Sequence, residues 1–152
     1  MAGESLFDNL LAYYDDRGWE YERVPDADVM SMQLNTTAWQ VTLVGSSSED
    51  SRIITLFARP AQVVPAASMT AIMELLTHIN FQLADGCWSM DPQDGELRFR
   101  MSGHFPEGPP STESLDRLHR FLVAGHDSYY KPIGAILDGE ATLGGAIAWL
   151  YG

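Results

Sequence analysis

Cysteine is nearly absent from this sequence: Cys87 is the only one among 152 residues. A single thiol can form neither an intrachain disulfide nor a paired-cysteine metal site. We therefore expect a fold held together by its hydrophobic core, in the reducing environment of the cytoplasm. Because Cys87 stands next to Trp88 in an apolar pattern, we expect it to be a small core residue rather than a nucleophile.

Long apolar runs are missing as well. No stretch approaches the roughly 20 apolar residues of a membrane-spanning helix. Residues 1–8 lack the basic start and the apolar stretch of a secretion signal, so we expect no membrane association. Hydrophobic residues make up 45% and charged residues 20% of the chain, which is typical of folded proteins. The length predicts a single domain over residues 1–152.

Basic residues are scarce. Nine Lys and Arg stand against 21 Asp and Glu, which gives a formal net charge of -12. A surface this negative repels phosphate backbones and argues against direct binding of nucleic acid. It attracts basic partners. The alternative is that the charge serves only to keep the protein in solution.

Established catalytic motifs are absent too, and no cofactor is predicted. The sequence contains no Walker A loop, no dinucleotide-binding glycine pattern and no nucleophile elbow. One set of side chains on a predicted helix could hold a divalent ion or transfer a proton: Asp116, His119, His126 and Asp127. We prefer the interpretation that these are solvated positions on the outer face of that helix. A metal-dependent enzyme built on His119 and His126 stays open as the third hypothesis.

Three segments have the apolar spacing of amphipathic helices, residues 5–17, 68–83 and 112–130. Ser5 and Ser111 are suitable N-caps, and Gly18 ends the first helix. In the third helix four residues are expected to face inward: Leu115, Leu118, Phe121 and Leu122.

Alternating patterns predict strands over residues 30–34, 39–43, 52–58, 87–91 and 96–103, with a weak edge strand over 20–24. Residues 52–58 are apolar on both faces, which predicts a covered central strand. Asp94-Gly95 predicts a hairpin turn rather than a calcium loop. Residues 133–137 and 143–150 are short apolar pieces after Pro132. The predicted fold class is α+β: an antiparallel sheet with three main helices, in the order α-β-β-β-α-β-β-α, plus a short C-terminal apolar segment.

The second helix and the hairpin after it resemble the YbjN family. The resemblance rests on an Asn that ends the helix, a Gly before the hairpin and an acidic Asp-Gly turn: Ile79-Asn80, Leu83, Gly86, Trp88, Met90-Asp91, Asp94-Gly95-Glu96-Leu97 and Arg98-Phe99-Arg100. Ser111, Glu113, Asp127 and Tyr129-Tyr130 of the third helix also fit. In element order the similarity spans residues 6–132, and the tail over 133–152 lies beyond it.

This resemblance implies a fold like that of type III secretion chaperones, which are small, acidic, non-enzymatic, cytoplasmic and usually dimeric. It implies no catalytic residues. The leading hypothesis is therefore a chaperone-like or adaptor homodimer that holds another protein, possible clients being basic, nucleic-acid-binding proteins. Its candidate partner-binding residues, chosen by residue type, are Trp39, Trp88 and Trp149. The second hypothesis is a sensory or stress regulator that binds a small molecule in a pocket.

Overall fold

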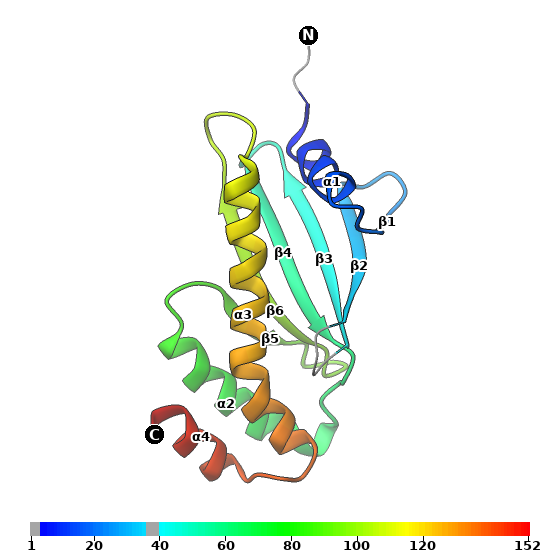
Figure 1. The fold of residues 1–152 in the computed structure, drawn as a ribbon. Helices are drawn as coiled ribbons and strands as arrows, with labels where there is room; N and C mark the ends of the chain where they lie inside the picture. Colours follow the sequence, from blue (N-terminus) through cyan, green and yellow to red (C-terminus); the bar gives the residue numbers. More distant parts are fainter. Residues whose placement is uncertain (1–3, 36–39) are drawn as a thin grey trace.

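The structure is a computed structural model that describes residues 4–35 and 40–152. Its centre is a six-stranded antiparallel sheet in the order β1-β2-β3-β4-β6-β5. Helices α1 and α3 lie side by side across one face of this sheet, and α2 and α4 pack near its β5 end (Figure 1). The strands are β1 (Glu22–Arg23), β2 (Val29–Asn35), β3 (Gln40–Ser48), β4 (Ile53–Pro60), β5 (Cys87–Met90) and β6 (Leu97–His104). The helices are α1 (Leu6–Asp16), α2 (Met69–Gln82), α3 (Thr112–Leu137) and α4 (Leu143–Tyr151), with a short 3-10 turn, η1 (Ala66–Ser68), before α2.

The first helix forms where the sequence predicts it. The Ser5 hydroxyl accepts a hydrogen bond from the Asp8 backbone, and the Asp8 carboxylate accepts one from the Ser5 backbone. This capping box satisfies amide groups that the first helical turn leaves without partners. The helix ends at Asp16, and Gly18 then takes a left-handed conformation with φ of 67°.

One face of the sheet is covered and the other is not. In β4 every second residue is buried, and the residues between them, such as Phe57, are only half-buried. The prediction of a strand covered on both faces is therefore wrong. The helices form a single layer, and apolar side chains on the outer face are shielded by neighbours such as Arg98, whose guanidinium lies 5.5 Å from the centre of the Phe57 ring.

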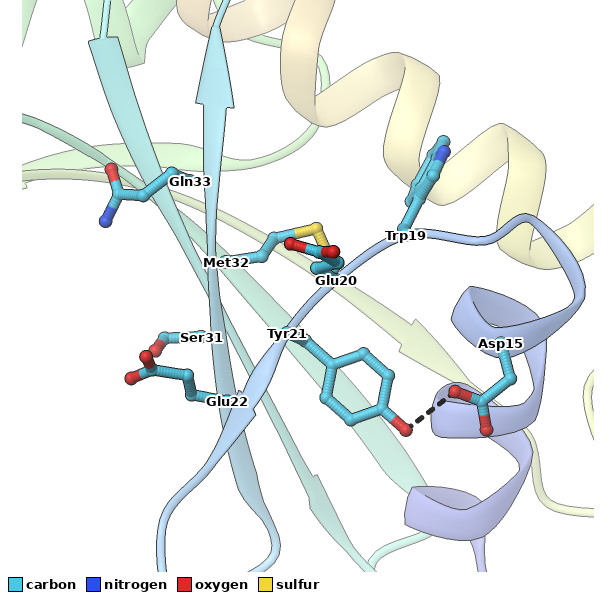
Figure 2. A pocket seen from close by; sticks show the side chains of 8 residues that line it. All are labelled: Asp15, Trp19, Glu20, Tyr21, Glu22, Ser31, Met32 and Gln33. Carbon is cyan, nitrogen blue, oxygen red and sulfur yellow. Dashed lines mark hydrogen bonds between the residues drawn. The ribbon is translucent and has the colours of Figure 1, made fainter.

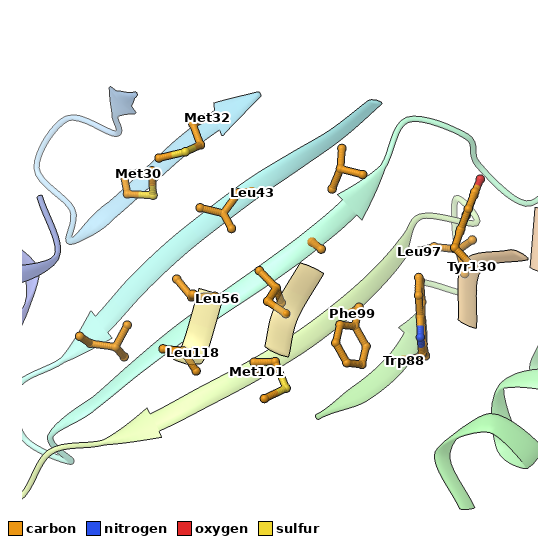
Figure 3. Close-up of a cluster of buried hydrophobic side chains, with 14 of the residues drawn as sticks. Met30, Met32, Leu43, Leu56, Trp88, Leu97, Phe99, Met101, Leu118 and Tyr130 are labelled. Atoms are coloured by element: carbon orange, nitrogen blue, oxygen red, sulfur yellow. The ribbon is translucent and has the colours of Figure 1, made fainter. Parts of the chain in front are cut away.

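The buried face of the sheet forms the core together with α1, α2 and α3. Met30, Leu43, Leu56 and Phe99 belong to four neighbouring strands and point to the same side (Figure 3). The predicted hairpin of β5 and β6 adds Trp88, which is 2% exposed. Asn80, at the end of α2, fixes this tryptophan by two backbone hydrogen bonds of 2.8 Å, one to its N–H and one to its C=O.

The third helix differs from its prediction in two ways. It continues through Pro132 to Leu137, so residues 133–137 are its last turns and not a separate piece. Ile133 is fully buried there, and its packing offsets the cost of proline inside a helix. Phe121, expected in the core, is 55% exposed. The second apolar piece forms α4, which packs against α2 and α3.

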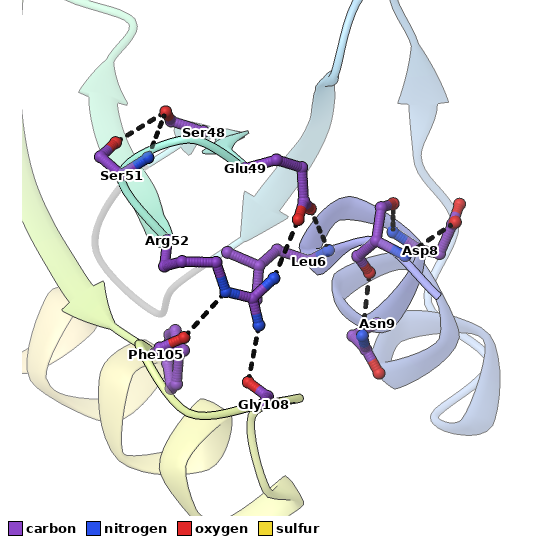
Figure 4. Close-up of polar contacts among 10 residues, drawn as sticks. Leu6, Asp8, Asn9, Ser48, Glu49, Ser51, Arg52, Phe105 and Gly108 are labelled. Atoms are coloured by element: carbon purple, nitrogen blue, oxygen red, sulfur yellow. Dashed lines mark hydrogen bonds and ion pairs between the residues drawn. The ribbon is translucent and has the colours of Figure 1, made fainter. Parts of the chain in front are cut away.

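Arg52 joins three parts of the fold at one end of the sheet. Its guanidinium donates to the carbonyl oxygens of Phe105 at 3.0 Å and Gly108 at 2.8 Å, and it pairs with Glu49 at 2.9 Å (Figure 4). Glu49 in turn accepts a hydrogen bond from the backbone of Leu6. The turn between β3 and β4 is thereby attached both to the start of α1 and to the loop before α3.

A glycine allows α3 to approach the sheet closely. A Cβ atom on Gly125 would lie 2.5 Å from the ring of Phe99, which is buried. Alanine is the better helix former by about 1 kcal/mol, but this contact is too short for it. We predict that Gly125→Ala lowers the free energy of unfolding by about 1–2 kcal/mol. Urea denaturation monitored by circular dichroism measures this change.

The matched control is Gly144→Ala in α4, where a new Cβ would meet nothing within 4 Å. This variant should leave the free energy of unfolding unchanged or raise it by up to about 1 kcal/mol. Equal effects of the two substitutions would contradict the close approach of α3 to Phe99.

Candidate functional site

A wide groove lies between the end of α1 and the outer edge of the sheet. It has a volume of about 820 Å³. Its floor is β2, and its walls come from the chain between α1 and β1 (Figure 2). We call it the edge groove; its lining residues are Asp15, Trp19, Glu20, Tyr21, Glu22, Ser31, Met32 and Gln33.

The groove exists because β1 is too short to cover β2. Strand β1 pairs with β2 only at Ser31 and Met30. The backbone of Val24 donates to Val29 at 2.9 Å, so the odd-numbered residues of β2 direct their N–H and C=O groups toward this edge. The backbone groups of Gln33 therefore face the groove, and no strand in the described part of the chain pairs with them. An unpaired edge of this kind is a template for an added strand.

Carboxylates surround the groove. Asp15, Glu20 and Glu22 line it. The first 28 residues of the chain contain 8 of its 21 acidic residues and 2 of its 9 basic ones, so they carry half of the net charge of -12. A groove with this lining favours a cationic occupant.

One of these carboxylates is placed by a tyrosine. The Tyr21 hydroxyl donates to Asp15 at 2.9 Å across the groove (Figure 2). Partial burial, followed by this bond, raises the pKa of Tyr21, so its hydroxyl remains a donor at neutral pH. The second oxygen of Asp15 is left for an occupant of the groove.

The aromatic wall of the groove is anchored to α3. Trp19, 40% exposed, stacks on Tyr14 with ring centres 5.9 Å apart. The buried Tyr14 hydroxyl bonds the Nε2 atom of His119 at 2.7 Å. Beside this pair, Asp116 accepts a hydrogen bond from Tyr13 at 2.6 Å and forms an ion pair with Arg17. Trp19 is therefore a fixed surface and not a loose side chain.

The two candidate catalytic histidines are core groups, which corrects the prediction that they are solvated. His119 is 8% and His126 is 1% exposed, and both lie on the inner side of α3. The Nδ1 atom of His119 lies 2.7 Å from the carbonyl oxygen of Leu115, so Nδ1 carries the proton and Nε2 accepts from Tyr14. Burial lowers the pKa of His119 and keeps the ring neutral.

His126 is packed differently. Its ring stacks on Tyr130, with centres 5.2 Å apart, and lies 5.3 Å from that of Trp88. Its Nδ1 atom lies 3.0 Å from Asp127, and burial lowers the pKa of the ring more than Asp127 raises it. Within residues 4–35 and 40–152, no group of three or more His, Cys, Asp or Glu side chains is arranged to hold a metal ion. The hypothesis of a metal site on α3 therefore finds no support in this geometry.

Of the three tryptophans proposed from the sequence as partner contacts, the structure describes two, Trp88 and Trp149. Trp88 is buried in the core and is not available at the surface. Trp149 is 50% exposed on α4, where Lys131 lies 5.9 Å from its ring centre. Trp39 lies outside the described residues. Sequence reasoning missed Trp19, although its position after the helix-ending Gly18 and beside Glu20 could have drawn attention to it.

The fold and the groove define a small α+β protein with an acidic groove at the edge of its sheet. The model of the YbjN family, with the description "Putative bacterial sensory transduction regulator", matches residues 7–134. The chain belongs to the YbjN family, and the resemblance stated from the sequence is confirmed. The match ends before α4, as does the similarity seen in the sequence.

Two solved structures are similar to this chain. The crystal structure of YbjN from E. coli aligns with a TM-score of 0.57 and 16% identity, covering 78% of this chain and 83% of the other. A chain of the heterodimeric ExoU–SpcU complex, from the type III secretion system of Pseudomonas aeruginosa, aligns with a TM-score of 0.46 and 18% identity, covering 77% and 91%. No curated protein matches the sequence significantly. In the described part of the chain, no helix has the length and apolar character needed to cross a membrane.

The buried histidines predict a dependence of stability on pH. Their pKa values are lowered in the folded protein, so below about pH 6.5 the unfolded chain binds more protons than the folded one. The stability they contribute is complete above this pH and is lost as the pH falls through it. We expect His126→Phe, which keeps the ring stacking, to reduce the slope of unfolding free energy against pH between about pH 6.5 and 5.

Urea denaturation at a series of pH values measures this slope. The control is Phe121→Leu, which changes an exposed ring on the same helix and no titratable group, so it should leave the slope unchanged. An unaltered slope in His126→Phe would show that folding does not lower the pKa of this imidazole.

Proposed function

We propose that this protein is a non-enzymatic, cytoplasmic adaptor that holds a basic, extended segment of another protein in the edge groove. The observation that carries the proposal is the coincidence of an unpaired strand edge and a ring of carboxylates. The segment adds to β2 as a further strand, and its main chain bonds the free groups of Gln33. Successive side chains of an added strand point to opposite faces, so one set of them meets Asp15 and the other set meets Glu22.

The role of the aromatic wall follows from its rigidity. Because Trp19 is stacked on Tyr14, it offers apolar area at little cost in conformational entropy. Its indole is also a good surface for a Lys or Arg side chain of the occupant. The groove therefore selects a segment by main-chain pairing, by positive charge and by one contact with an aromatic ring.

Peptide binding tests this function. The probe is a fluorescein-labelled nine-residue peptide of alternating Lys and Val, compared with one of alternating Glu and Val, and the measurement is fluorescence anisotropy. We expect saturable binding of the Lys peptide, and weaker binding as salt rises. The double variant Glu20→Lys, Glu22→Lys should reduce the affinity about tenfold, equivalent to about 1.4 kcal/mol.

The control makes charge reversals of the same kind elsewhere. Glu113 is 81% exposed on α3, and Glu113→Lys combined with Glu107→Lys in the loop before α3 produces the same net change in charge. If the control weakens binding as much as the groove variant, the peptide responds to net charge and the groove is not its site. Equal binding of the Lys and Glu peptides would also reject the proposal.

A second candidate function, the sensing of a small molecule, is favoured by one cavity. Between the last turns of α3 and α4 lies a mostly apolar hollow of about 410 Å³, lined by residues that include Pro132, Ala146 and Trp149. This volume is within the range of small-ligand sites. Pro132 lies within the part of the chain that the family model matches, whereas α4, which supplies Ala146 and Trp149, lies beyond it.

A thermal-shift screen of apolar metabolites tests this second function. A genuine ligand should raise the Tm of the wild-type protein and should lose this effect in Trp149→Ala. Trp19→Ala, in the edge groove, is the control and should retain the shift. If no compound shifts the Tm, or if both variants keep the shift, the cavity is not a sensing site.

A further inference from the structure

The open face of the sheet carries charge of the opposite sign to the rest of the chain. Strands β2 to β6 contain none of the 21 acidic residues and three of the nine Lys and Arg residues, namely Arg59, Arg98 and Arg100. Ala58 and Phe99, which alternate with them, are buried, so the three arginine side chains lie on the outer face that no described helix covers (Figure 1). We call these three residues the arginine cluster. Solubility does not account for it, because cations on so acidic a chain reduce the magnitude of its net charge of -12.

The members of the arginine cluster are close neighbours. Ala58 lies opposite Phe99, so the next residues along the two antiparallel strands, Arg59 and Arg98, are side by side. Arg100 stands two residues after Arg98 and therefore on the same face. The Cα atoms of the cluster thus span about 5 Å across the strands and about 7 Å along them. The side chain of Arg59 is 40% exposed, that of Arg98 is 45% exposed, and Arg100 is exposed as well, so an outside group can reach all three.

A carboxylate of the chain itself shows how this cluster holds an anion. Glu96, just before β6, accepts a hydrogen bond from Nε of Arg98 at 2.5 Å and lies 3.6 Å from Nη1 of Arg59. Two guanidinium groups therefore converge on one anionic group. The guanidinium of Arg100 donates to Sγ of Cys87 at 3.4 Å, and no carboxylate in the described part of the chain pairs with it. Three guanidinium charges less one carboxylate charge leave the cluster with a net charge of +2.

This arrangement distinguishes between kinds of anion. A carboxylate of a partner would only replace Glu96, since it exchanges one singly charged group for another. A phosphate monoester carries about -1.5 to -2 charges and three acceptor oxygens, so it can bond more than two guanidinium groups at once. Nucleic acid offers phosphodiesters of one charge each, and its further phosphates would lie over the acidic remainder of the chain. The arginine cluster therefore favours a phosphate monoester.

We propose that the outer face of β4 and β6 binds a phosphorylated side chain of another protein. The phosphate displaces Glu96 and is shared by the three guanidinium groups of the arginine cluster. Small phosphorylated molecules bind in concave sites that surround them, whereas an open sheet face offers an extended segment contacts on both sides of its phosphate. Thr55 and Ser102, whose hydroxyl groups lie 3.3 Å apart, continue the polar surface along the same two strands. This proposal goes beyond the holding of a basic client in the edge groove and does not depend on it.

Phosphopeptide binding tests the proposal. The probe is a fluorescein-labelled nine-residue Gly–Ser peptide with phosphoserine at its centre, and the measurement is fluorescence anisotropy. We expect saturable binding of this peptide. The peptides with Ser or Glu at the same position should bind at least about tenfold more weakly.

Two variants of the cluster should shift this affinity in opposite directions. Arg98→Gln combined with Arg100→Gln should lower it at least about tenfold. Glu96→Gln should raise it several-fold, because it removes the carboxylate with which the phosphate competes.

The matched controls make the same changes of charge on α3. Arg117→Gln combined with Arg120→Gln, and separately Glu113→Gln, alter exposed side chains far from the cluster in the sequence and should leave the affinity nearly unchanged. Far-UV circular dichroism verifies that each variant is folded.

Several results would overturn the proposal. They are the absence of saturable binding, equal binding of the Glu peptide, equal effects of the cluster variants and their controls, and no gain of affinity in Glu96→Gln. Competition by free phosphoserine as strong as that by the peptide would point to a small molecule, and equally tight binding of a nine-residue oligothymidine would point to nucleic acid; either result rejects a phosphorylated protein segment. The Lys–Val peptide should bind the arginine variants as it binds the wild-type protein, so failure at this face and failure at the edge groove are separate results.

Discussion

The rest of this structure depends on a single layer of helices across one face of the sheet. Helix α1 covers the β3 and β4 region, and α3 crosses β4 and β6. The two helices are joined by the Tyr14–His119 hydrogen bond and the Arg17–Asp116 ion pair. Because each layer is only one element thick, strands β2 to β6 each have one buried face, whereas both residues of β1 are exposed. How much of each sheet edge is paired depends on the lengths of β1 and β5. Those two short strands determine where the surface stays open.

Periodicity in the sequence was sufficient to predict most of this architecture. The alternation of Leu97, Phe99 and Met101 with polar residues marks β6, and all three side chains are buried. Ser5 and Gly18 define α1 to within one residue. The continuation of α3 through Pro132 was not predictable locally, because the energy that offsets a helical proline comes from tertiary packing.

The histidines show a different limit of what can be predicted from the sequence. His119 and His126 recur at the spacing of Leu115, Leu122 and Tyr130, so the helical pattern itself places them on the buried stripe. They were assigned to the outer face because imidazole is polar. Its two nitrogens, however, can be satisfied inside a protein by one carbonyl and one hydroxyl group, as Leu115 and Tyr14 do for His119.

The candidate site was predictable only in part. Composition indicated an acidic protein that attracts basic partners, and counting charges along the chain would have placed half of the net charge before residue 29. The open edge could not be inferred, since it depends on how far the chain after Gly18 diverges from β2. Choosing contacts by residue type gave Trp88, which belongs to the core. Exposure is a property of the folded chain, and the sequence does not specify it for a single tryptophan.

The two-residue length of β1 also determines where the unpaired part of β2 begins. Since Glu22 and Arg23 already occupy the positions opposite Ser31 and Met30, a visiting strand can align with β2 only beyond Ser31. The register of such a strand on β2 is therefore limited sterically by β1 and not only by side-chain preference. A longer or shorter β1 would change which stretch of β2 is left open, while the hydrophobic core stays untouched.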